Sequence, residues 1–460
     1  MEEVFDRKKN LILKEKNLYK SIVILALPVF FSNLLKSIHS FVDMYFISPL
    51  GDNAISSIQL TNPIIMISIA LAMGFMIAGI AIMSQAIGAK NIDSAKKIGG
   101  QLLVLCIISG IILNIVIFLS APLLVRMVAG SGEEQTVKYA LDYVRMRSFE
   151  LVPLFTFFAF HASRQASGDT VTPVIYNIIA IVINIFLTGY FVRGLNLEVA
   201  GAALATVIGN AIIVPFYLVM MFKDKKADVS LSLDDLKLKP YEMKKIVSLG
   251  IPSAIAQGFT SLGFLILNSL ILYYFSESTL SAFSVGNNIN SLILMPAMGI
   301  GGVIPTFVGQ NIGANNPKRA RKSVKSALIL SSVFMTLGGL ALLPFRYQLG
   351  GIFLKDNYET LSLSVEYMFF LFTSLPLMAI FQVFMGAYQG AGYTKFSMIL
   401  AILRLWGMRV PMVLIFKGLM DLDSSSIWYA MVISNFGATI IGVILYRLIR
   451  FDHKIKLSEE

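Results

Sequence analysis

Long runs of apolar residues, separated by short polar segments, dominate the pattern of this chain. The segments Ile22–Ile47, Ile58–Met83 and Leu102–Met127 each run for some twenty residues or more with at most a few ionisable groups. A bilayer core about 30 Å thick is crossed by about 20 helical residues, so these runs predict membrane-spanning helices. A membrane-spanning barrel would instead show alternating segments of about ten residues, which the sequence lacks.

The same pattern recurs to the end of the chain and predicts an all-α integral membrane protein with twelve transmembrane helices. Hydrophobic residues make up 56% of the 460 positions and charged residues only 14%, far fewer than in a soluble domain. The first seventeen residues are too charged for a signal peptide, so we expect the first span to act as the insertion signal. The single cysteine, Cys106, excludes an internal disulfide or a cysteine-based metal site. The predicted spans are centred near residues 35, 70, 114, 157, 182, 210, 260, 294, 334, 377, 406 and 438.

Basic residues are concentrated in alternate polar segments. The chain has 38 Lys and Arg against 27 Asp and Glu, a net charge of +11. With the N-terminus inside, 27 of the basic residues fall in cytoplasmic segments, 8 in outer loops and their flanks, and 3 within spans. By the positive-inside rule, this bias predicts that both termini are cytoplasmic. The net charge therefore reflects membrane topology, and no nucleic-acid partner is expected.

An internal repeat divides the chain into two halves. The segment Gln85–Asn91 (QAIGAKN) matches Gln310–Asn316 (QNIGANN), and the other matched pairs have the same separation of 224 or 225 residues. Chance matches would scatter in their separation. Each half is thus predicted to hold six helices, related by an axis along the membrane normal, with a cavity between the lobes that opens to either side by rocking. The predicted domains are an N-terminal lobe (1–222), a cytoplasmic linker (223–246) and a C-terminal lobe (247–460). The other pairs are 24–28 with 248–252, 74 with 299, 164–168 with 388–392, and 204–210 with 429–435.

The whole chain resembles the multidrug and toxic compound extrusion (MATE) family of the multidrug/oligosaccharidyl-lipid/polysaccharide flippase superfamily. The resemblance rests on Phe41–Ile47 (FVDMYFI) followed by Leu50-Gly51, the paired QxIGAxN loops, and Asn184–Thr188 (NIFLT) leading to Gly201–Thr206 (GAALAT). It implies a V-shaped antiporter of the prokaryotic plasma membrane that expels organic cations in exchange for sodium ions or protons. It also implies a monomer without a cofactor, in contact with membrane lipids, and no enzymatic activity.

Asp43 is the candidate coupling residue because it is the only carboxylate well inside a predicted span. A charge at that depth is costly, so we expect it to face the bundle interior or a water-filled cavity. The resemblance supports a proton or cation site, whereas the alternative interpretation is an Asp paired with a neighbour to fix helix packing. The repeat places Asn268 at the same position in the second lobe.

The resemblance adds Asn184 and Thr206 to the coupling site, and it places Thr188 where the family usually has a second Asp. A sodium ion requires several hard oxygen ligands, which Asp43, Asn184 and Thr206 would supply with Thr188. With one carboxylate such a site would be weaker than with two. The alternative interpretation is ordinary hydrogen bonding between helices.

Lys36 and His39 share one helical face with Asp43. The family's usual residues at these two positions are Gln and Tyr. We expect His39 to meet Asp43 and to act either as a proton relay or as a buried hydrogen-bonding group. The Lys36 ammonium would compete with a mobile cation, unless it snorkels toward an interface.

Other residues are candidates for the substrate cavity or for structural roles. We expect Arg409 to neutralise carbonyl groups freed by Pro411, His161 to be a satisfied interior histidine, and Arg147 with Glu150 to form a surface ion pair. Gly88 and Gly313 are expected to close short turns. The candidates for the substrate cavity are Asn268, Arg404, Trp406, Met73, Asn62 and Asn287.

Two other functions compete with drug export. A flippase for lipid-linked saccharides of the same superfamily is kept open by Lys36 and Arg404, although twelve spans argue against it. An intramembrane enzyme would need paired carboxylates, a His-Asp or Ser-His set, or a metal cluster within the spans, and we do not expect the one Asp and two His there to form a catalytic set. The loss of the second carboxylate and the presence of His39 favour protons over sodium as the coupling ion.

Overall fold

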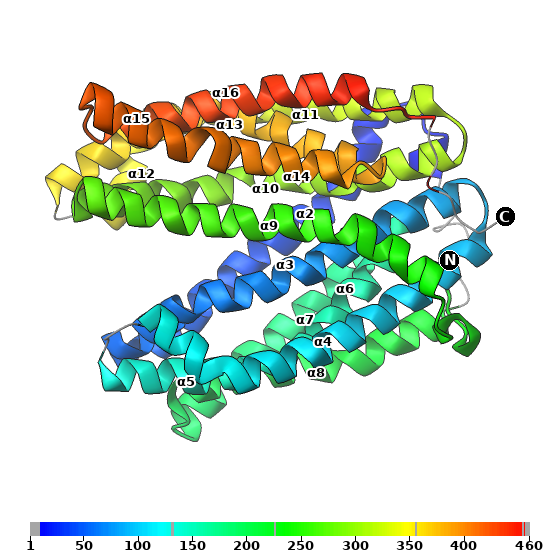
Figure 1. The fold of residues 1–460 in the computed structure, drawn as a ribbon, viewed down its shortest axis with the longest axis horizontal. Coiled ribbons are helices and arrows are strands. Elements are labelled where there is room, and N and C mark those ends of the chain that lie inside the picture. The colour runs from blue at the N-terminus through cyan, green and yellow to red at the C-terminus, as the bar shows by residue number, and fades with distance from the viewer. Residues whose placement is uncertain (1–9, 130–132, 225–226, 355–356, 453–454, 456–460) are drawn as a thin grey trace.

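The computed structural model describes residues 10–129, 133–224, 227–354, 357–452 and 455, and within these ranges it contains helices and no strand. The helices form two groups, which Figure 1 shows one above the other. The N-terminal half comprises α2–α8 and the C-terminal half comprises α9–α16. Both chain ends lie at the same end of the molecule, on the right in Figure 1. We call this the terminal end.

Six long helical rods make up the N-terminal half. Phe149 and Glu150, between α5 and α6, keep right-handed helical backbone angles, with φ of −68° and −67°, so these two helices form one bent rod. The π-helical turn Tyr190–Gly194 extends α7. The helices are α2 (Leu18–Ile47), α3 (Asp52–Gly88), α4 (Ile92–Ala129), α5 (Glu134–Ser148), α6 (Leu151–Ala166), α7 (Val171–Gly189) and α8 (Glu198–Phe222).

The C-terminal half repeats this arrangement. Its fifth rod is built from α14 (Thr394–Ile402), the π-helical segment Leu403–Arg409 and α15 (Val410–Met420). The other helices are α9 (Pro240–Tyr274), α10 (Glu277–Gly313), α11 (Pro317–Leu342), the short α12 (Arg346–Phe353), α13 (Tyr358–Gly390) and α16 (Ser425–Leu448).

Eleven of the helices in the described residues are long and apolar enough to cross a membrane. The remaining span, predicted near residue 157, is the bent rod of α5 and α6, in which α6 alone has only 16 residues. Polar side chains cap the N-termini of several helices. The Asn17 side chain accepts from the Lys20 amide at the start of α2, and the Ser276 side chain accepts from the Thr279 amide at the start of α10.

The two halves approach each other closely where α3 and α10 end. A Cβ atom at Gly88 would overlap the carbonyl group of Gln310, and one at Gly313 would overlap that of Gln85. In the turns that follow α3 and α10, the residues with a positive φ angle are Lys90 (60°) and Asn315 (57°), each two positions after the glycine. The two glycines therefore allow the close approach of two helices, and the expectation that they close turns is wrong.

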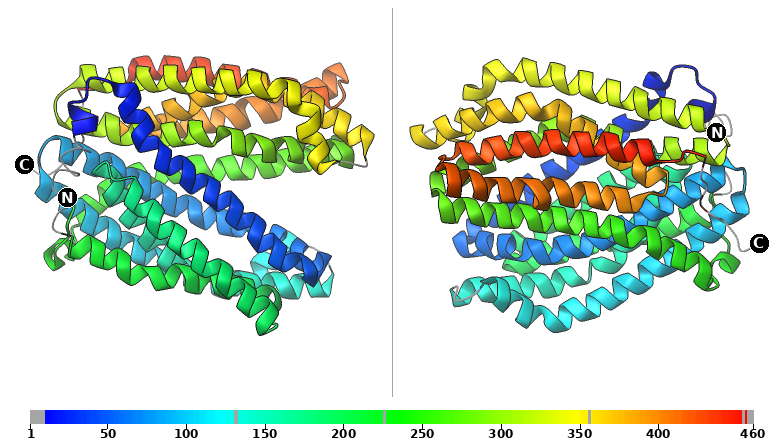
Figure 2. Two further views of the ribbon diagram at one scale, coloured as in Figure 1. Left: turned by 180° about the vertical axis from the view of Figure 1, so that it is seen from behind. Right: turned by 45° about the horizontal axis from the view of Figure 1, so that its top comes forward.

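Buried amide side chains join the halves at this same end. Gln85 Nε2 donates to the Gly390 carbonyl (3.2 Å), Gln165 Nε2 to that of Gly302 (2.6 Å), and Gln310 Nε2 to that of Ala166 (2.7 Å). The first turns of α2 also pack into the core of the C-terminal half, before the helix runs diagonally to the N-terminal half, as Figure 2 shows. The halves are thus held together at the terminal end.

The segment between the halves is packed along α4. Gln101 Nε2 donates to the carbonyls of Asp235 and Lys237, both at 2.8 Å, and its Oε1 accepts from the Lys239 amide at 2.9 Å. Helix α9 already begins at Pro240, inside the segment 223–246 that the sequence suggests as a linker.

Candidate functional site

The polar face of α2 carries His39 and Asp43 one helical turn apart. His39 Nε2 lies 3.6 Å from Asp43 Oδ2, and their side chains are 20% and 25% exposed. Asp43 Oδ1 is buried and has no hydrogen-bond partner among the described residues. The carboxylate is thus partly desolvated, and one of its oxygens is free to bind a cation or a proton.

Asn184 on α7 links this face to two other positions. Its Oδ1 lies 2.6 Å from His39 Nε2 and accepts a longer bond, 3.4 Å, from Thr188 Oγ1. Its Nδ2 donates to Thr206 Oγ1 on α8 at 3.1 Å. Since an amide oxygen only accepts, the His39 tautomer in this arrangement has its proton on Nε2. Five of the residues singled out in the sequence therefore form one network.

This network has a consequence for the binding of a metal ion. The amide oxygen of Asn184, which would be a sodium ligand, is occupied by His39. The hydroxyl of Thr206 donates to the Ala202 carbonyl at 3.0 Å while it accepts from Asn184. A sodium ion at Asp43, Asn184 and Thr206 would therefore have to displace His39, whereas a proton needs only the Asp43 oxygen.

A buried ion pair adjoins the network. The predicted pairing of Arg147 with Glu150 is confirmed, but its expected position at the surface is wrong. Arg147 Nε lies 2.9 Å from Glu150 Oε2, and the side chains are only 15% and 8% exposed. Asn210 on α8 donates to Glu150 Oε1 at 2.9 Å. The pair lies inside the N-terminal half because α5 and α6 form one bent rod, and Arg147 is within electrostatic range of Asp43.

Lys36 faces the interior of the N-terminal half. Its side chain is exposed, and no acidic residue is paired with it among the described residues. Its ammonium lies within electrostatic range of His161 on α6, which itself contacts the Phe157 ring and hydrogen bonds with Gln165.

The internal repeat shows what replaces this network in the C-terminal half. A separation of 225 residues takes Asp43 to Asn268, Asn184 to Arg409 and Asn210 to Asn435. The side chain of Asn268 is exposed, whereas that of Arg409 is buried. The position equivalent to Asn184 thus carries a positive charge.

Arg409 is held by side chains of α16. Its Nε donates to Ser434 Oγ at 3.0 Å and its Nη2 to Asn435 Oδ1 at 2.8 Å. The expectation that Arg409 serves backbone carbonyls freed by Pro411 is therefore wrong. The same π-helical segment carries Arg404, whose guanidinium lies 4.0 Å from the centre of the Phe381 ring.

The other candidates for the substrate cavity are scattered. Trp406 Nε1 donates to the Phe259 carbonyl at 2.7 Å, and Asn287 Oδ1 accepts from the Tyr367 hydroxyl at 2.9 Å. Met73 packs against the core of the N-terminal half, and Asn62 on α3 is exposed. No contact among the described residues joins these four into one site.

Known proteins share this arrangement. A family model described as MatE matches residues 28–189 and 252–415, once in each half. This chain belongs to the MatE family. The probable multidrug resistance protein YoeA of Bacillus subtilis is 24% identical over 90% of both chains. The probable multidrug resistance protein NorM of Thermotoga maritima is 26% identical over 98% of this chain and 97% of its own.

The fold of this MatE protein matches that of a solved structure. The outward-facing conformation of a multidrug resistance MATE family transporter of the MOP superfamily superposes with a TM-score of 0.89, at 22% identity over 96% of this chain and 97% of the other. The predicted fold of twelve helices in two lobes is confirmed. The protein is a multi-pass membrane transporter and not an enzyme.

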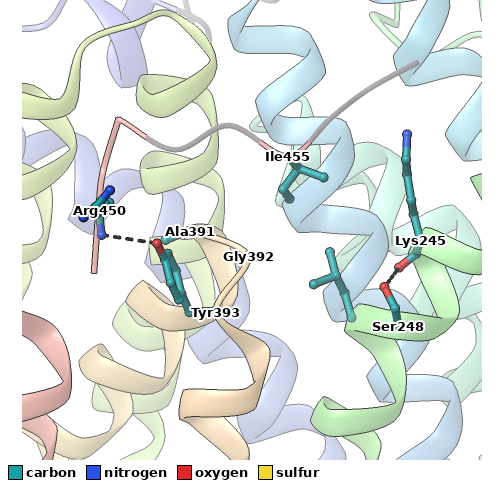
Figure 3. Close-up of a pocket in the computed structure, with 8 residues that line it drawn as sticks. Lys245, Ser248, Ala391, Gly392, Tyr393, Arg450 and Ile455 are labelled. Carbon is teal, nitrogen blue, oxygen red and sulfur yellow. Dashed lines mark hydrogen bonds between the residues drawn. The ribbon is translucent and has the colours of Figure 1, made fainter. Parts of the chain in front are cut away.

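A pocket at the terminal end of this MatE protein was not expected from the sequence. It has a volume of about 490 Å³ and lies between the start of α9 and the turn after α13, as Figure 3 shows. The amide of Ile455, from the C-terminal segment, donates to Gln85 Oε1 at 2.9 Å. The pocket thus borders the contact between the halves. Its lining residues are Lys245, Ser248, Leu249, Ala391, Gly392, Tyr393, Arg450 and Ile455.

Proposed function

We propose that this MatE protein exports amphiphilic organic molecules across the prokaryotic plasma membrane in exchange for protons. The observation that carries the proposal is the position of His39, with one nitrogen close to both Asp43 and Asn184. A carboxylate, an imidazole and a polar anchor in contact form a short path for a proton.

The proton step uses this chain's own groups. The proposed proton acceptor is Asp43 Oδ1, which is buried and has no hydrogen-bond partner among the described residues. His39 is oriented by Asn184 and delivers or removes that proton. Neutralising Asp43 weakens its attraction for His39 and Arg147, which couples the charge of the site to the packing of α2 against α7.

Sodium is the alternative coupling ion. Asp43, Asn184, Thr206 and Thr188 supply one carboxylate, one amide and two hydroxyls, and His39 would have to leave the amide oxygen first. The buried contacts at the terminal end support alternating access, in which the two halves separate there when the opposite side closes. The positive-inside bias supports a cytoplasmic location for that end.

The substrate is expected to be a cationic amphiphile, as the resemblance implies and the names of the multidrug relatives suggest. Aromatic and methionine side chains are abundant, at 33 Phe and 22 Met, and such surfaces adapt to varied apolar bodies. The flippase alternative keeps support from Lys36 and Arg404, which are basic residues within spans.

Transport in liposomes tests the proposal. We would measure uptake of ethidium into inside-out proteoliposomes with an acidic lumen, and separately with a sodium gradient at equal pH. Proton antiport predicts uptake with the pH gradient alone. Ethidium uptake driven only by the sodium gradient would identify sodium, and not the proton, as the coupling ion. Flipping of a labelled lipid-linked sugar without ethidium uptake would support the flippase function.

A further inference from the structure

Two buried guanidinium groups in the C-terminal half have no acidic partner. Arg404 is 7% exposed and Arg409 is 3% exposed. Among the described residues, neither forms an ion pair with a carboxylate, and the charged group within range of Arg404 is Arg409 itself. Glu366 lies one position from Tyr367 on α13, but its side chain is exposed. Burying two positive charges together is costly, so a purely structural role for both is unfavourable.

The hydrogen bonds of these groups are incomplete. Arg409 has its bonds to Ser434 and Asn435, which explain how it is held. Within the part of the chain that the structure describes, Arg404 Nε and Asn435 Nδ2 are both buried without a hydrogen-bond partner. The Arg404 guanidinium lies over the face of the Phe381 ring. These two free groups are both donors, which is the pattern expected where an acceptor-rich ligand binds.

The backbone here also departs from regular helix. Both arginines lie in the π-helical segment Leu403–Arg409, and such wide turns are frequent at functional sites. By the repeat, Arg409 stands where Asn184 stands in the N-terminal half. The N-terminal half thus has a neutral amide at this place, whereas the C-terminal half has a positive charge.

Each of the two guanidinium groups has an aromatic ring near it. Phe381 stacks on Arg404, and Trp406 lies between the two arginines in sequence with its ring against Phe259. Tyr367 is within electrostatic range of Arg409 and stacks on Trp428 at 4.5 Å. Guanidinium groups bind carboxylate, sulfonate and phosphate groups through paired hydrogen bonds. The aromatic rings are suited to contact the apolar part of an amphiphilic ligand.

We propose that Arg404 and Arg409 form an anion-binding subsite, which accepts amphiphilic organic molecules carrying a carboxylate, sulfonate or phosphate group. This assignment rests on the proposed transport function and names a substrate class for the C-terminal half. It extends the range of substrates beyond the cations expected from the family resemblance.

Thermal stabilisation in dodecyl maltoside micelles tests the subsite without any ion gradient. The probes are 5-carboxyfluorescein, dioctanoyl phosphatidic acid, inorganic phosphate and, as the cation, ethidium. Wild type should be stabilised by both amphiphilic anions more than by inorganic phosphate. Arg404→Gln should weaken the apparent affinity for the anions by about tenfold or more, because a charge-assisted bond is lost. Its effect on ethidium should be small.

Matched variants keep the test decisive. Arg404→Gln removes a buried unpartnered charge, so it should fold with an unchanged or higher melting temperature, even where Arg409→Gln fails to fold. Arg404→Lys should retain part of the anion affinity. Arg447→Gln removes the same charge from an exposed position on α16 and should leave anion binding unchanged.

The outcomes separate the sources of the anion. Arg404-dependent binding of phosphatidic acid alone would identify a lipid phosphate, and binding of both amphiphiles would identify organic anions in general. Absence of anion stabilisation, or equal anion affinity in Arg404→Gln and Arg447→Gln, would overturn the proposal. Because no gradient is involved, that result would leave proton-coupled ethidium export standing.

Discussion

His39 Nε2 lies 2.6 Å from Asn184 Oδ1, and this contact joins α2 to α7 at the level of Asp43. It gives the histidine a fixed tautomer and a fixed position beside the carboxylate. Under the proposed proton coupling, an imidazole, which can itself carry a proton, would accompany the single carboxylate Asp43 where the family usually has two.

Replacement of His39 by Phe should slow the proton step while leaving the fold intact. The ring keeps most of the volume but neither exchanges protons nor donates to Asn184. We expect ethidium uptake driven by an acidic lumen to fall at least about tenfold, the lower part of the range for loss of a general acid or base. His453→Phe is the control, because it removes a histidine distant in sequence from α2. Equal rates in wild type and His39→Phe would exclude a relay.

Lys36→Gln should improve the handling of cationic substrates. If a bound cation lies about 8–10 Å from the Lys36 ammonium, the two charges repel by roughly 2 kcal/mol at an effective dielectric of about 20. That repulsion lowers the occupancy of the substrate site by more than about tenfold. The apparent KM for ethidium should therefore fall in Lys36→Gln, with Lys20→Gln, exposed near the start of the same helix, as the control. An unchanged KM would mean that substrates do not approach Lys36.

Glu150→Gln should destabilise the N-terminal half. It leaves the Arg147 guanidinium buried without its counter-charge, and breaking a buried pair in this way costs about 3–5 kcal/mol. The melting temperature in micelles should drop clearly, whereas Glu134→Gln, exposed at the start of α5, should leave it nearly unchanged. Similar melting temperatures for the two variants would show that water reaches the Arg147–Glu150 pair.

Gly88→Ala should loosen the contact between the halves. The added methyl group overlaps the Gln310 carbonyl, and such overpacking costs about 1–3 kcal/mol. Maleimide labelling of a Ser84→Cys reporter, buried at this contact, should become faster; the native Cys106 is buried and gives little background. Gly338→Ala, which meets nothing within 4 Å, is the control. Unchanged labelling in Gly88→Ala would show that the contact tolerates the methyl group.

The sequence was sufficient to predict the membrane spans, because hydropathy is a local signal. It was also sufficient to predict the two equivalent halves, because the repeats have a constant separation. The i, i+4 spacing also placed His39 against Asp43, whereas Asn184, Thr188 and Thr206 were added to the site by the family resemblance. It could not place Arg147 and Glu150, because their burial depends on α5 and α6 joining into one bent rod. The repeat relates Arg409 to Asn184 and Asn435 to Asn210, but the contact between Arg409 and Asn435 depends on how α16 packs against the π-helical segment.

The most direct test of the central claim is proton-driven uptake by Asp43→Asn, compared with Asp52→Asn, an exposed carboxylate at the start of α3. The amide of Asp43→Asn keeps the shape of the side chain and removes its proton site. The melting temperature of this variant should therefore stay within roughly a few degrees of the wild-type value. We predict that ethidium uptake with an acidic lumen is lost in Asp43→Asn and retained in Asp52→Asn. Uptake by folded Asp43→Asn at the wild-type rate would contradict the account.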